Sequence, residues 1–524
     1  MLTRWGRSLD PDAPLPEHPR PQLVRDTEWV NLNGRWDHSF SDTPQEPETW
    51  NGTIVVPFSP EAELSGVGRQ LQPDEWLFYR RMFDAPTTTG RVLLHFGAVD
   101  QSCTVWVNGV EVGSHTGGYL PFTFDITEAL QDHNELIVRV RDESEHAPHA
   151  RGKQRLDNGQ IWYTAQSGIW QTVWLEAVPD VYITDLEITP DLRTASFDVV
   201  AHTSDGGARR SVVQGEPRLW SPDDPHLQSF EVTVGGDTVR TYAALREFGI
   251  RDGRFTLNGE TIQHVGVLDQ GYWSDGLLTP PSDAAMVHDI ATMKELGFNV
   301  LRKHVKIEPL RWYHHCDRLG MLVWQDMVNG GGRYRHLVAV RPARKWTPLP
   351  DRLYPLFFRS NKAARAEFRE EVRRTVRLLR NSPCVALWTP FNEGWGQFDA
   401  NAIAREVKRL DPGRSVNHAS GWVDQGGGDV KSVHCYLQPF AMPRGRRGRV
   451  VALSEYGGHN LRVEGHDWSS REFGYRRHAT PEAFGEAFAA LHRTLASFVP
   501  QGLAATVYTQ VSDVEDELNG LLTW

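Results

Sequence analysis

The pattern of hydrophobic and polar residues changes near residue 254. Before this point, short runs of alternating apolar and polar residues are separated by Gly, Pro and Asn, which is typical of antiparallel β-sheets. After it, short apolar runs alternate with amphipathic stretches, which is the pattern of repeated βα units around a parallel sheet. The sequence therefore predicts a β-rich first half followed by an α/β second half.

The clearest element of the first half is a hairpin at 104–112. Apolar residues alternate there around Asn108-Gly109, and this pair readily adopts the positive φ angles of a two-residue type I′ turn. Further strands are predicted at 91–97, 135–141 and 169–176. We expect an N-terminal arm over 1–25 and a β-sandwich over 26–180.

A second, shorter β region follows, from the run VYITDLEIT to the run SFEVTVGG. The LWSPDDP between these runs carries prolines, which can end strands but do not sit centrally in a sheet. The region is shorter than the ~100 residues of a complete immunoglobulin-like sandwich. We therefore expect a truncated immunoglobulin-like domain over 181–253.

The second half, 254–524, contains eight apolar runs that we interpret as parallel strands. Plausible helices lie between several of them, for example at 282–297, 361–381 and 481–498. Eight βα units in this length fit a TIM barrel, which typically takes ~250 residues. The predicted strands are 261–268, 298–302, 321–325, 384–391, 414–418, 430–436, 450–455 and 504–510.

Two glutamates stand at the ends of predicted barrel strands. Glu393 lies in the run Asn392-Glu393-Gly394-Trp395 after the fourth strand, and Glu455 ends the seventh. Active sites of TIM barrels lie at the carboxyl ends of the strands. Paired carboxylates there suit glycoside hydrolysis, in which one protonates the leaving oxygen while its partner attacks the sugar or activates water. The sequence pattern leaves open which glutamate takes which part.

Other polar residues share the predicted barrel mouth, because residues two apart on a strand face the same side. Arg302 and His304 therefore point together, as do His434 and Tyr436. An arginine or a tyrosine hydroxyl beside Glu455 would keep that carboxylate ionised. We expect sugar contacts from six strand-end residues: Asp269, His304, Asp326, Trp395, His434 and Gln510.

The stretch from Met327 to Ser360 is too long for a plain connection on the catalytic side of the barrel. It carries three consecutive glycines at 330–332, followed by Arg344 and Trp346. Loops of this length without predicted secondary structure often serve as walls or lids of active sites. We expect it to form part of the pocket wall or a lid.

Composition narrows the classes of ligand and compartment. The 56 Lys and Arg against 67 Asp and Glu give a net charge of −11, which argues against nucleic acid as a partner. No apolar stretch approaches the ~20 residues of a membrane span, and the proline-rich start lacks the apolar core of a signal peptide, so we expect a cytoplasmic protein without membrane contact. The four cysteines are far apart and no zinc-binding spacing occurs, so we predict neither a metal nor another cofactor.

A set of short motifs follows in order along nearly the whole chain. They are LNGRW, WLFYRRMF, LLHFGAVD, VWVNG, GGYLPFTFDIT, SGIWQTVWLE, LWSPDDP, FTLNGE, GFNVLRKH, LGMLVWQDM, WTPFNEGWG and ALSEYGG. On these motifs the sequence resembles glycoside hydrolase family 2, the group of β-galactosidases, β-glucuronidases and β-mannosidases. The resemblance implies a jelly-roll β-sandwich, an immunoglobulin-like domain and a TIM barrel, with hydrolysis that retains the anomeric configuration.

The resemblance also implies roles for individual residues. Glu393 after Asn392 matches the acid/base of the family, and Glu455 in SEYGG matches its nucleophile. Asn392 would then bind the 2-hydroxyl of the sugar, while Arg302 and Tyr436 match positions that steady the nucleophile.

Two departures from the family pattern bear on substrate and metal. Glucuronidases of the family carry an Asn-X-Lys motif after the nucleophile, whereas this chain has no lysine after Lys431, so a uronic acid is disfavoured unless an arginine substitutes. The magnesium-dependent β-galactosidases of the family place further acidic and histidine ligands after the third strand, where this chain reads VWQDMVNGGG.

The leading functional hypothesis is a retaining exo-β-glycosidase that acts on an oligosaccharide or small glycoside. We expect it to remove a terminal non-reducing neutral sugar, with β-galactosides first. Glucuronides, mannosides, arabinosides and galactofuranosides stay open, as does homo-oligomerisation. The competing class is a non-catalytic, lectin-like carbohydrate-binding protein. A serine hydrolase is disfavoured because no GxSxG elbow occurs.

Overall fold

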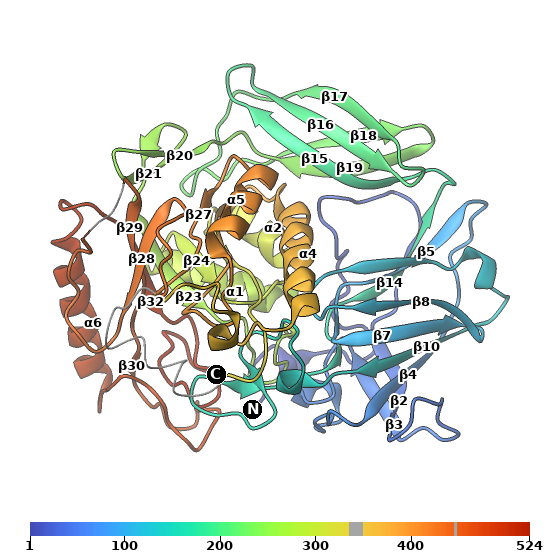
Figure 1. The fold of residues 1–524 in the computed structure, drawn as a ribbon. Helices are drawn as coiled ribbons and strands as arrows, with labels where there is room; N and C mark the ends of the chain where they lie inside the picture. Colours follow the sequence, from blue (N-terminus) through green and yellow to red (C-terminus); the bar gives the residue numbers. More distant parts are fainter. Residues whose placement is uncertain (335–348, 445–447) are drawn as a thin grey trace.

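The protein is described from a computed structural model that covers residues 1–334, 349–444 and 448–524. Two β-rich units lie side by side with an α/β barrel, and both chain ends lie near each other at the lower edge of the view in Figure 1. The β-rich first half and the α/β second half predicted from sequence are therefore both present.

The first unit is a sandwich of a four-stranded and a six-stranded sheet. Its core joins apolar side chains of both sheets, such as Leu94 and Leu175 of one and Trp36 and Val138 of the other. The sheet orders are β1-β14-β5-β9 and β3-β2-β4-β10-β7-β8. The strands are β1 (Trp29–Asn31), β2 (Gly34–Ser41), β3 (Gly52–Val56), β4 (Trp76–Phe83), β5 (Arg91–Phe96), β7 (Ser102–Val107), β8 (Val110–Thr116), β9 (Phe122–Asp125), β10 (Asn134–Arg141) and β14 (Val173–Val178).

The hairpin predicted at 104–112 is confirmed. Strands β7 and β8 pair antiparallel, and the turn between them has positive φ at both Asn108 and Gly109 (51° and 77°). Both central residues of a type I′ turn require such angles, and asparagine and glycine tolerate them best. The turn chemistry of these two residues thus sets the pairing beside the turn, and the register shifts between Trp106 and Val105.

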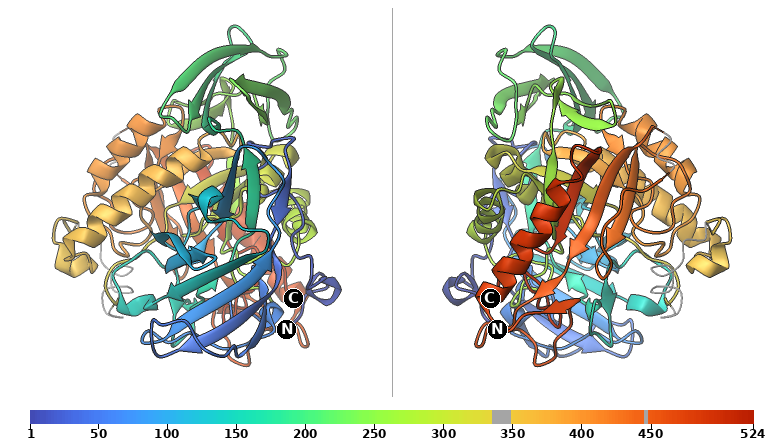
Figure 2. Two further views of the ribbon diagram at one scale, coloured as in Figure 1. Left: turned by 90° about the vertical axis from the view of Figure 1, so that its right-hand side faces the viewer. Right: turned by 90° about the vertical axis from the view of Figure 1, so that its left-hand side faces the viewer.

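The second unit is smaller and sits above the sandwich in Figure 1 and in both views of Figure 2. A three-stranded and a two-stranded sheet enclose a core that includes Leu186, Phe197, Val199, Val232 and Val239. Its five strands compare with about seven in a complete immunoglobulin-like sandwich. They are β15 (Ile183–Asp191), β16 (Ser196–Thr203), β17 (Ala208–Gln214), β18 (Gln228–Val234) and β19 (Asp237–Ala243).

The barrel consists of eight parallel strands, one for each predicted apolar run. Their spatial order is β27-β26-β25-β24-β23-β32-β29-β28. Within the described residues no strand pairing joins β27 to β28, so the barrel is nearly closed. The strands are β23 (His264–Asp269), β24 (Val300–Lys303), β25 (Leu322–Asp326), β26 (Val385–Thr389), β27 (Ser415–Val416), β28 (Val430–Cys435), β29 (Val450–Gly457) and β32 (Leu503–Thr509).

Helices follow only five of these strands in the part of the chain that is described. They are α1 (Asp283–Glu295), α2 (Leu310–Leu319), α4 (Lys362–Leu379), α5 (Ala400–Leu410) and α6 (Pro481–Ala496). The helices predicted at 282–297, 361–381 and 481–498 correspond to α1, α4 and α6, and within the described residues no helix follows β27, β28 or β32. The segment after β27 carries four glycines between 421 and 428, and glycine costs a helix ~1 kcal/mol per residue relative to alanine.

Local sequence signals explain where the helices begin. Helix α1 is capped by the Ser282 side chain, which accepts a hydrogen bond from the backbone N–H of Ala285 (3.1 Å). Asn361 and Thr480 cap α4 and α6 in the same way. On α4, Phe368, Val372, Val376 and Leu379 are buried at helical spacing against the barrel.

None of the helices in the described part of the chain is long and apolar enough to cross a membrane.

A long loop of the sandwich, residues 142–168, reaches across to the mouth of the barrel. Within this bridging loop, the backbone N–H groups of Arg151 and Gly152 both donate to the carbonyl of Asn329 in the loop after β25 (2.9 Å each). Farther along, the backbone N–H of Thr164 donates to Glu515 Oε1 after β32 (2.8 Å). The sandwich therefore contributes directly to the catalytic side of the barrel, which the sequence pattern did not reveal.

Candidate active site

Glu393 stands just beyond the carboxyl end of β26. Asn392 still pairs with Ser420 beside it, and the backbone N–H of Glu393 donates to the carbonyl of Ser420 (2.8 Å). Glu393 then adopts a left-handed backbone conformation, with φ of 50°. Such a conformation is costly for a non-glycine residue and persists where the surrounding structure enforces it, which is common at functional sites.

Glu455 lies inside strand β29, on the opposite side of the mouth. Arg302 Nη1 donates to its Oε1 (2.8 Å), and the hydroxyl of Tyr436 donates to its Oε2 (2.6 Å). Its side chain is only 6% exposed. Two strong donors therefore hold one buried carboxylate in a fixed orientation.

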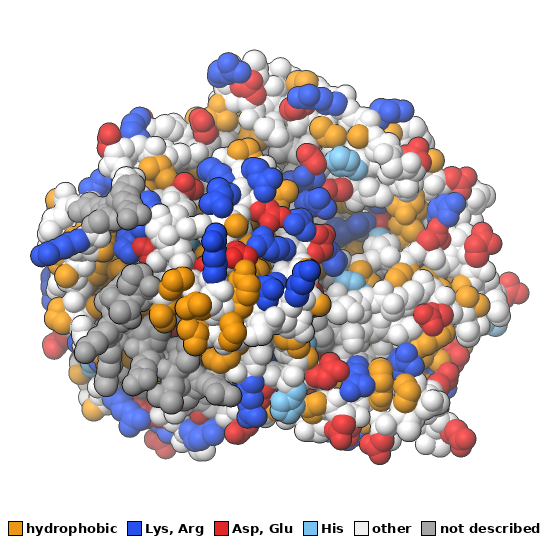
Figure 3. Space-filling view, viewed as in Figure 1, with side chains coloured by type: hydrophobic (Ala, Val, Ile, Leu, Met, Phe, Trp, Pro, Cys, Tyr) orange, Lys and Arg blue, Asp and Glu red, His pale blue; other side chains and the backbone are white. Residues whose placement is uncertain are grey.

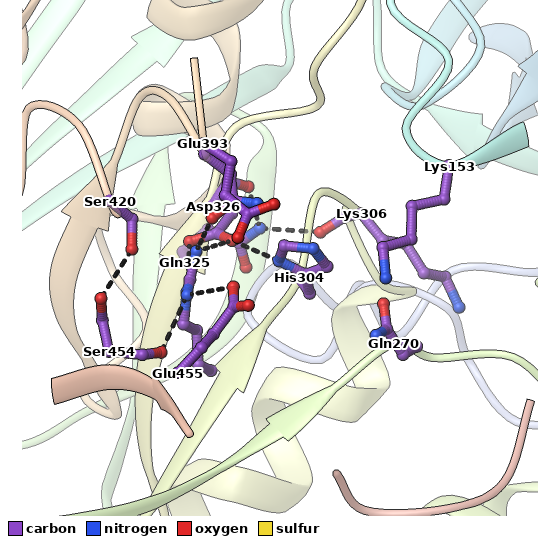
Figure 4. Close-up of polar contacts among 12 residues, drawn as sticks. Lys153, Gln270, His304, Lys306, Gln325, Asp326, Glu393, Ser420, Ser454 and Glu455 are labelled. Carbon is purple, nitrogen blue, oxygen red and sulfur yellow. Dashed lines mark hydrogen bonds and ion pairs between the residues drawn. The ribbon is translucent and has the colours of Figure 1, made fainter. Parts of the chain in front are cut away.

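The two carboxylates face one another across a small space. In Figure 4, Glu393 points down and Glu455 points up into this space, with His304 beside it. His434 Nδ1 lies 2.7 Å from Glu393 Oε1 and 3.3 Å from Glu455 Oε2. Carboxylate oxygens of the two glutamates and a ring nitrogen of His434 all lie within 4.8 Å of one another. Two acidic side chains distant in sequence thus meet in one cavity.

The surroundings shift the pKa values of the two glutamates in opposite directions. Burial raises the pKa of Glu393 above its usual value, and the neighbouring charge of Glu455 raises it further. Burial also opposes ionisation of Glu455, but interactions with His434, Arg302 and His304 and the Tyr436 hydrogen bond outweigh it and lower the pKa of Glu455 to about 2. Glu393 therefore holds its proton to higher pH than Glu455 does.

Arg302 organises the floor of the site. Besides Glu455, its guanidinium binds both carboxylate oxygens of Asp326 (3.1 and 2.9 Å), and Nη2 donates to Asn392 Oδ1 (2.8 Å). An arginine only donates, so the amide oxygen of Asn392 must face it and the Nδ2 must point elsewhere. That Nδ2 is buried without a hydrogen-bond partner among the described residues. It is a free donor beside the two glutamates.

Three of the expected sugar contacts are bonded elsewhere. Asp326 is 1% exposed, and its oxygens bind Arg302 and His304 Nδ1 (2.9 Å), so it positions these side chains from below. Asp269 pairs with Lys303 (2.7 Å), on the face of the strands opposite to Arg302. Gln510 bonds Gln270 (2.7 Å) and Asn519 (2.6 Å) and is fully buried. Position at a strand end was therefore too coarse a criterion for these three.

The other predicted residues do gather around the glutamates. His304 lies above Asp326, and its ring is 6.4 Å from that of Trp395. Burial lowers the pKa of His304 to about 4 despite its hydrogen bond with Asp326. His434 bridges the carboxylates and its Nε2 lies 2.9 Å from the hydroxyl of Ser420. Six of the predicted residues share the site with Glu393 and Glu455: Arg302, His304, Asn392, Trp395, His434 and Tyr436.

An aromatic wall and a lysine were not predicted. Trp162 of the bridging loop packs on Trp395 (ring centroids 5.2 Å apart) and on Tyr334 (5.7 Å). Lys153 of the same loop enters from the far side of His304 in Figure 4, and its Nζ lies 3.3 Å from the hydroxyl of Tyr163. The adjacent aromatic residues Trp162 and Tyr163 in a turn-rich stretch were the available signal, but only the folded chain shows that they face the barrel.

The stretch from Met327 to Ser360 contributes to this wall through Tyr334, as expected for a pocket loop. Phe358 supports Tyr334 edge-on at 5.4 Å. Arg344 and Trp346 lie outside the described residues.

The arrangement of Glu393, His434 and Glu455 also has the dimensions of a metal site. Both oxygens of Glu455, however, already accept hydrogen bonds from Arg302 and Tyr436, and the arginine places a positive charge 2.8 Å from Oε1. A cation bound there would face that charge directly. The donors present suit an ionised nucleophile better than a metal ligand.

Eight parallel barrel strands with two facing carboxylates at their carboxyl ends are the arrangement of a glycoside hydrolase. Two family models match the chain: the TIM barrel domain of glycosyl hydrolases family 2 over 248–438 and the galactose-binding domain-like domain of glycosyl hydrolase 2 over 51–171. The chain belongs to glycoside hydrolase family 2.

Curated relatives and solved structures agree on the family while differing in activity. A β-galactosidase of Halalkalibacterium halodurans is 24% identical over 460 residues, 78% of this chain and 40% of that protein. The β-galactosidase of Erwinia tasmaniensis is 24% identical over 523 residues, covering 81% of this chain and 46% of its own length. This chain thus spans less than half the length of these relatives.

Among solved structures, a β-glucuronidase from an uncultured Clostridium species superposes with a TM-score of 0.74 at 16% identity, covering 96% of each chain. A β-galacturonidase of Eisenbergiella tayi superposes with a TM-score of 0.70 at 18% identity, covering 95% of this chain and 91% of its own. At these identities the likeness establishes the fold.

Proposed function

We propose that the chain is a retaining exo-β-glycosidase that removes a terminal non-reducing neutral sugar, with β-galactosides as the first candidates. One observation supports the chemistry above all: two facing carboxylates whose pKa values are shifted in opposite directions. Their oxygens lie within 4.8 Å of each other. Retention uses carboxyl groups ~5–5.5 Å apart, whereas inversion needs ~6.5–9.5 Å to admit a water molecule.

In the first step, protonated Glu393 donates its proton to the glycosidic oxygen as the bond to C1 breaks. A carboxylate oxygen of Glu455 attacks C1 from the opposite face and forms a covalent ester with the sugar. In the second step, ionised Glu393 removes a proton from water, whose oxygen attacks C1 and releases Glu455. Each glutamate ends the cycle in the protonation state in which it began.

The neighbouring residues fit the proposed roles of Glu393 as acid/base and Glu455 as nucleophile. Arg302 and Tyr436 keep Glu455 ionised and oriented for attack. The unpartnered Nδ2 of Asn392 can donate to the 2-hydroxyl of the sugar, a contact that strengthens in the transition state of glycosidases. The aromatic wall of Trp162 and Trp395 offers apolar faces for the sugar ring.

The exo mode of action is supported by the walls of the cavity. The bridging loop binds the segment after β32 through Asn158, which donates to Glu515 Oε2 (2.6 Å), and through Thr164. A mouth closed on this side admits the end of a saccharide more readily than its middle.

A second candidate is a hexuronide, and Lys153 is the observation that favours it. This lysine is 6% exposed, and its positive charge acts to lower the pKa values of both Glu393 and His304. A carboxylate on the bound sugar could pair with its ammonium group, although Glu517 already lies 3.6 Å away. For a uronide substrate, Lys153→Met should lower kcat/KM at least tenfold while leaving any neutral glycoside within twofold.

The decisive experiment is a panel of nitrophenyl glycosides assayed with the wild-type chain, Glu393→Ala and Glu455→Ala. The panel includes β-galactoside, β-glucuronide, β-galacturonide, β-mannoside, α-arabinoside and β-galactofuranoside. We expect turnover of at least one glycoside and its loss in both variants. Full activity in either variant contradicts the proposal, and saturable sugar binding without turnover of any member would favour the lectin-like alternative.

A further inference from the structure

A second concave site lies away from the barrel mouth, where the sandwich, the second β unit and the barrel meet. It is a cleft of about 290 Å³, close to the lower end (~300 Å³) of small-molecule pockets. Its walls come from β5 and β14 of the sandwich, β15 of the second unit, helix α4 and the N-terminal arm. Figure 3 shows a hollow at this junction, with Lys and Arg side chains gathered beside it.

Arginines dominate the charge of this junction cleft. Three line it, Arg20, Arg374 and Arg377, against a single acid, Asp185. Asp185 is already neutralised by Arg380 (2.7 Å), and Arg20 by Glu176 (2.7 Å). Arg374 and Arg377 form no ion pair within the described residues, in a protein whose net charge is −11, although the charge of Arg374 acts on the buried Glu371.

Arg374 and Arg377 stand three residues apart on α4 and so face the same side of the helix. Arg374 donates one hydrogen bond, to the carbonyl of Pro121 (3.0 Å), and Arg377 makes no hydrogen bond or ion pair within the described residues. Their remaining N–H groups are available to a ligand. A guanidinium fork matches the geometry of a carboxylate or sulfate.

The wall opposite the arginines carries a second, independent feature. Trp174 is 2% exposed and stacks on His95 with ring centroids 4.7 Å apart. Its indole Nε1 is buried without a hydrogen-bond partner in the described part of the chain. An orphaned buried donor is costly unless a bound group or water satisfies it. Because His95 stacks on the indole and the Arg20 guanidinium lies over it at 5.7 Å, Trp174 offers the cleft its unpartnered N–H and not an open ring face.

We infer that the junction cleft binds an acidic saccharide, with its carboxylate or sulfate on Arg374 and Arg377 and one of its oxygens accepting from Trp174 Nε1. The cleft takes one or two sugar rings, and its apolar lining by Leu120, Pro121 and Leu378 suits a pyranose better than a bare ion. The inference concerns a site separate from Glu393 and Glu455 and does not rest on the activity proposed for them.

The test is calorimetry on the full chain with three probes: a galacturonic acid disaccharide, the neutral galactose disaccharide and sodium sulfate. We expect the acidic disaccharide to bind, with an affinity that falls as salt is raised. The neutral disaccharide should bind at least tenfold more weakly. Equal affinity for both disaccharides would overturn the proposal. Sulfate binding as tight as that of the acidic disaccharide would overturn the assignment of a saccharide.

Variants separate this cleft from the active site. The double variant Arg374→Gln/Arg377→Gln should bind the acidic disaccharide at least tenfold more weakly, and Trp174→Phe about three- to tenfold more weakly, because it keeps the ring and loses one donor. Arg405→Gln, an exposed arginine of α5, is the matched control and should bind as the wild type does.

The arginine variants should unfold at the temperature of the wild type, whereas Trp174→Phe, which leaves a cavity at a buried position, should unfold at a lower temperature. Every variant should keep kcat/KM for any hydrolysed glycoside within twofold. Unchanged disaccharide affinity in the folded double variant overturns the site. Arg377→Gln alone, at an exposed position, provides the same test if the double variant is unstable.

Discussion

Glu393 and Glu455 carry the same chemical group but stand in opposite surroundings. Glu455 lies within strand β29, where the pairing register shifts toward both neighbouring strands, and accepts two hydrogen bonds, from Arg302 and Tyr436. Glu393 lies beyond the end of its strand, in a left-handed turn, and its carboxylate contacts His434 alone among the described side chains. The pKa of Glu455 accordingly falls to about 2 while that of Glu393 rises. Identical side chains thus acquire, through their neighbours, the opposite pKa shifts that the proposed acid and nucleophile require.

The difference originates in the barrel. Arg302 comes from β24 and reaches across the barrel interior to Glu455. The position of this donor, which keeps the carboxylate of Glu455 ionised, therefore depends on the packing of the whole sheet. Glu393 is positioned by the short pairing between Asn392 and Ser420, outside the regular strands. Glu455, the proposed nucleophile, is therefore held by a side chain of the barrel sheet, whereas Glu393, the proposed acid, is held by a turn.

The largest effect is expected at Glu455. Glu455→Gln keeps the shape of the side chain and removes the attacking charge, so kcat should fall on the order of 10⁴-fold or more for every glycoside that the protein hydrolyses. Steady-state assays across substrates measure this. Glu486→Gln, an exposed position on α6, is the control and should remain as active as the wild type. Residual activity above a hundredth of wild type would contradict the assignment.

The effect at Glu393 should depend on the leaving group. Glu393→Gln removes the proton donor, which typically contributes ~10²–10⁴-fold, so hydrolysis of alkyl glycosides should fall by that factor. Dinitrophenyl glycosides need little protonation, and their first step should fall much less. Rates with both leaving groups, measured by stopped flow, test the comparison. A uniform loss for both would show that Glu393 is not the acid.

Tyr436→Phe should produce a smaller loss. It removes one of the two donors to Glu455, a hydrogen bond to a charged group worth ~1.5–3 kcal/mol, and we expect kcat/KM to fall about tenfold. The acid limb of the pH profile should move to higher pH, because the pKa of Glu455 rises. Tyr456→Phe, whose hydroxyl bonds His492 (2.8 Å), is the matched control. An unshifted acid limb would exclude this role for Tyr436.

The smallest effect concerns the pH profile. The rate should fall as pH rises through the raised pKa of Glu393, which must be protonated, and as pH falls toward about 2, where Glu455 gains a proton. His434 interacts with both carboxylates and lowers both pKa values. His434→Gln should therefore shift both limbs to higher pH. Limbs that move in opposite directions would contradict the shared contact.

Much of the fold could be predicted from local patterns. The Asn108-Gly109 pair fixes a hairpin turn, and the eight apolar runs of the second half all became barrel strands. No helix could be placed after β27, because the glycine-rich segment 421–428 that follows it does not favour a helix. The family match over 248–438 agrees with the barrel interpretation.

The candidate site was predictable only in part. Strand ends pointed to the two glutamates, and alternation along β24 and β28 placed Arg302 with His304 and His434 with Tyr436. Alternation could not show that Asp269 would pair with Lys303 behind the strands. Trp162 and Lys153 reach the site through tertiary contacts of the bridging loop, which no local pattern encodes.

The most direct measurement is the stereochemistry of the sugar as it is first released. Proton NMR during hydrolysis of a β-glycoside by the wild-type chain would record the anomer before mutarotation. The close approach of Glu393 and Glu455 predicts the β-anomer as the first product. Initial release of the α-anomer would show a single displacement by water and contradict Glu455 as the nucleophile.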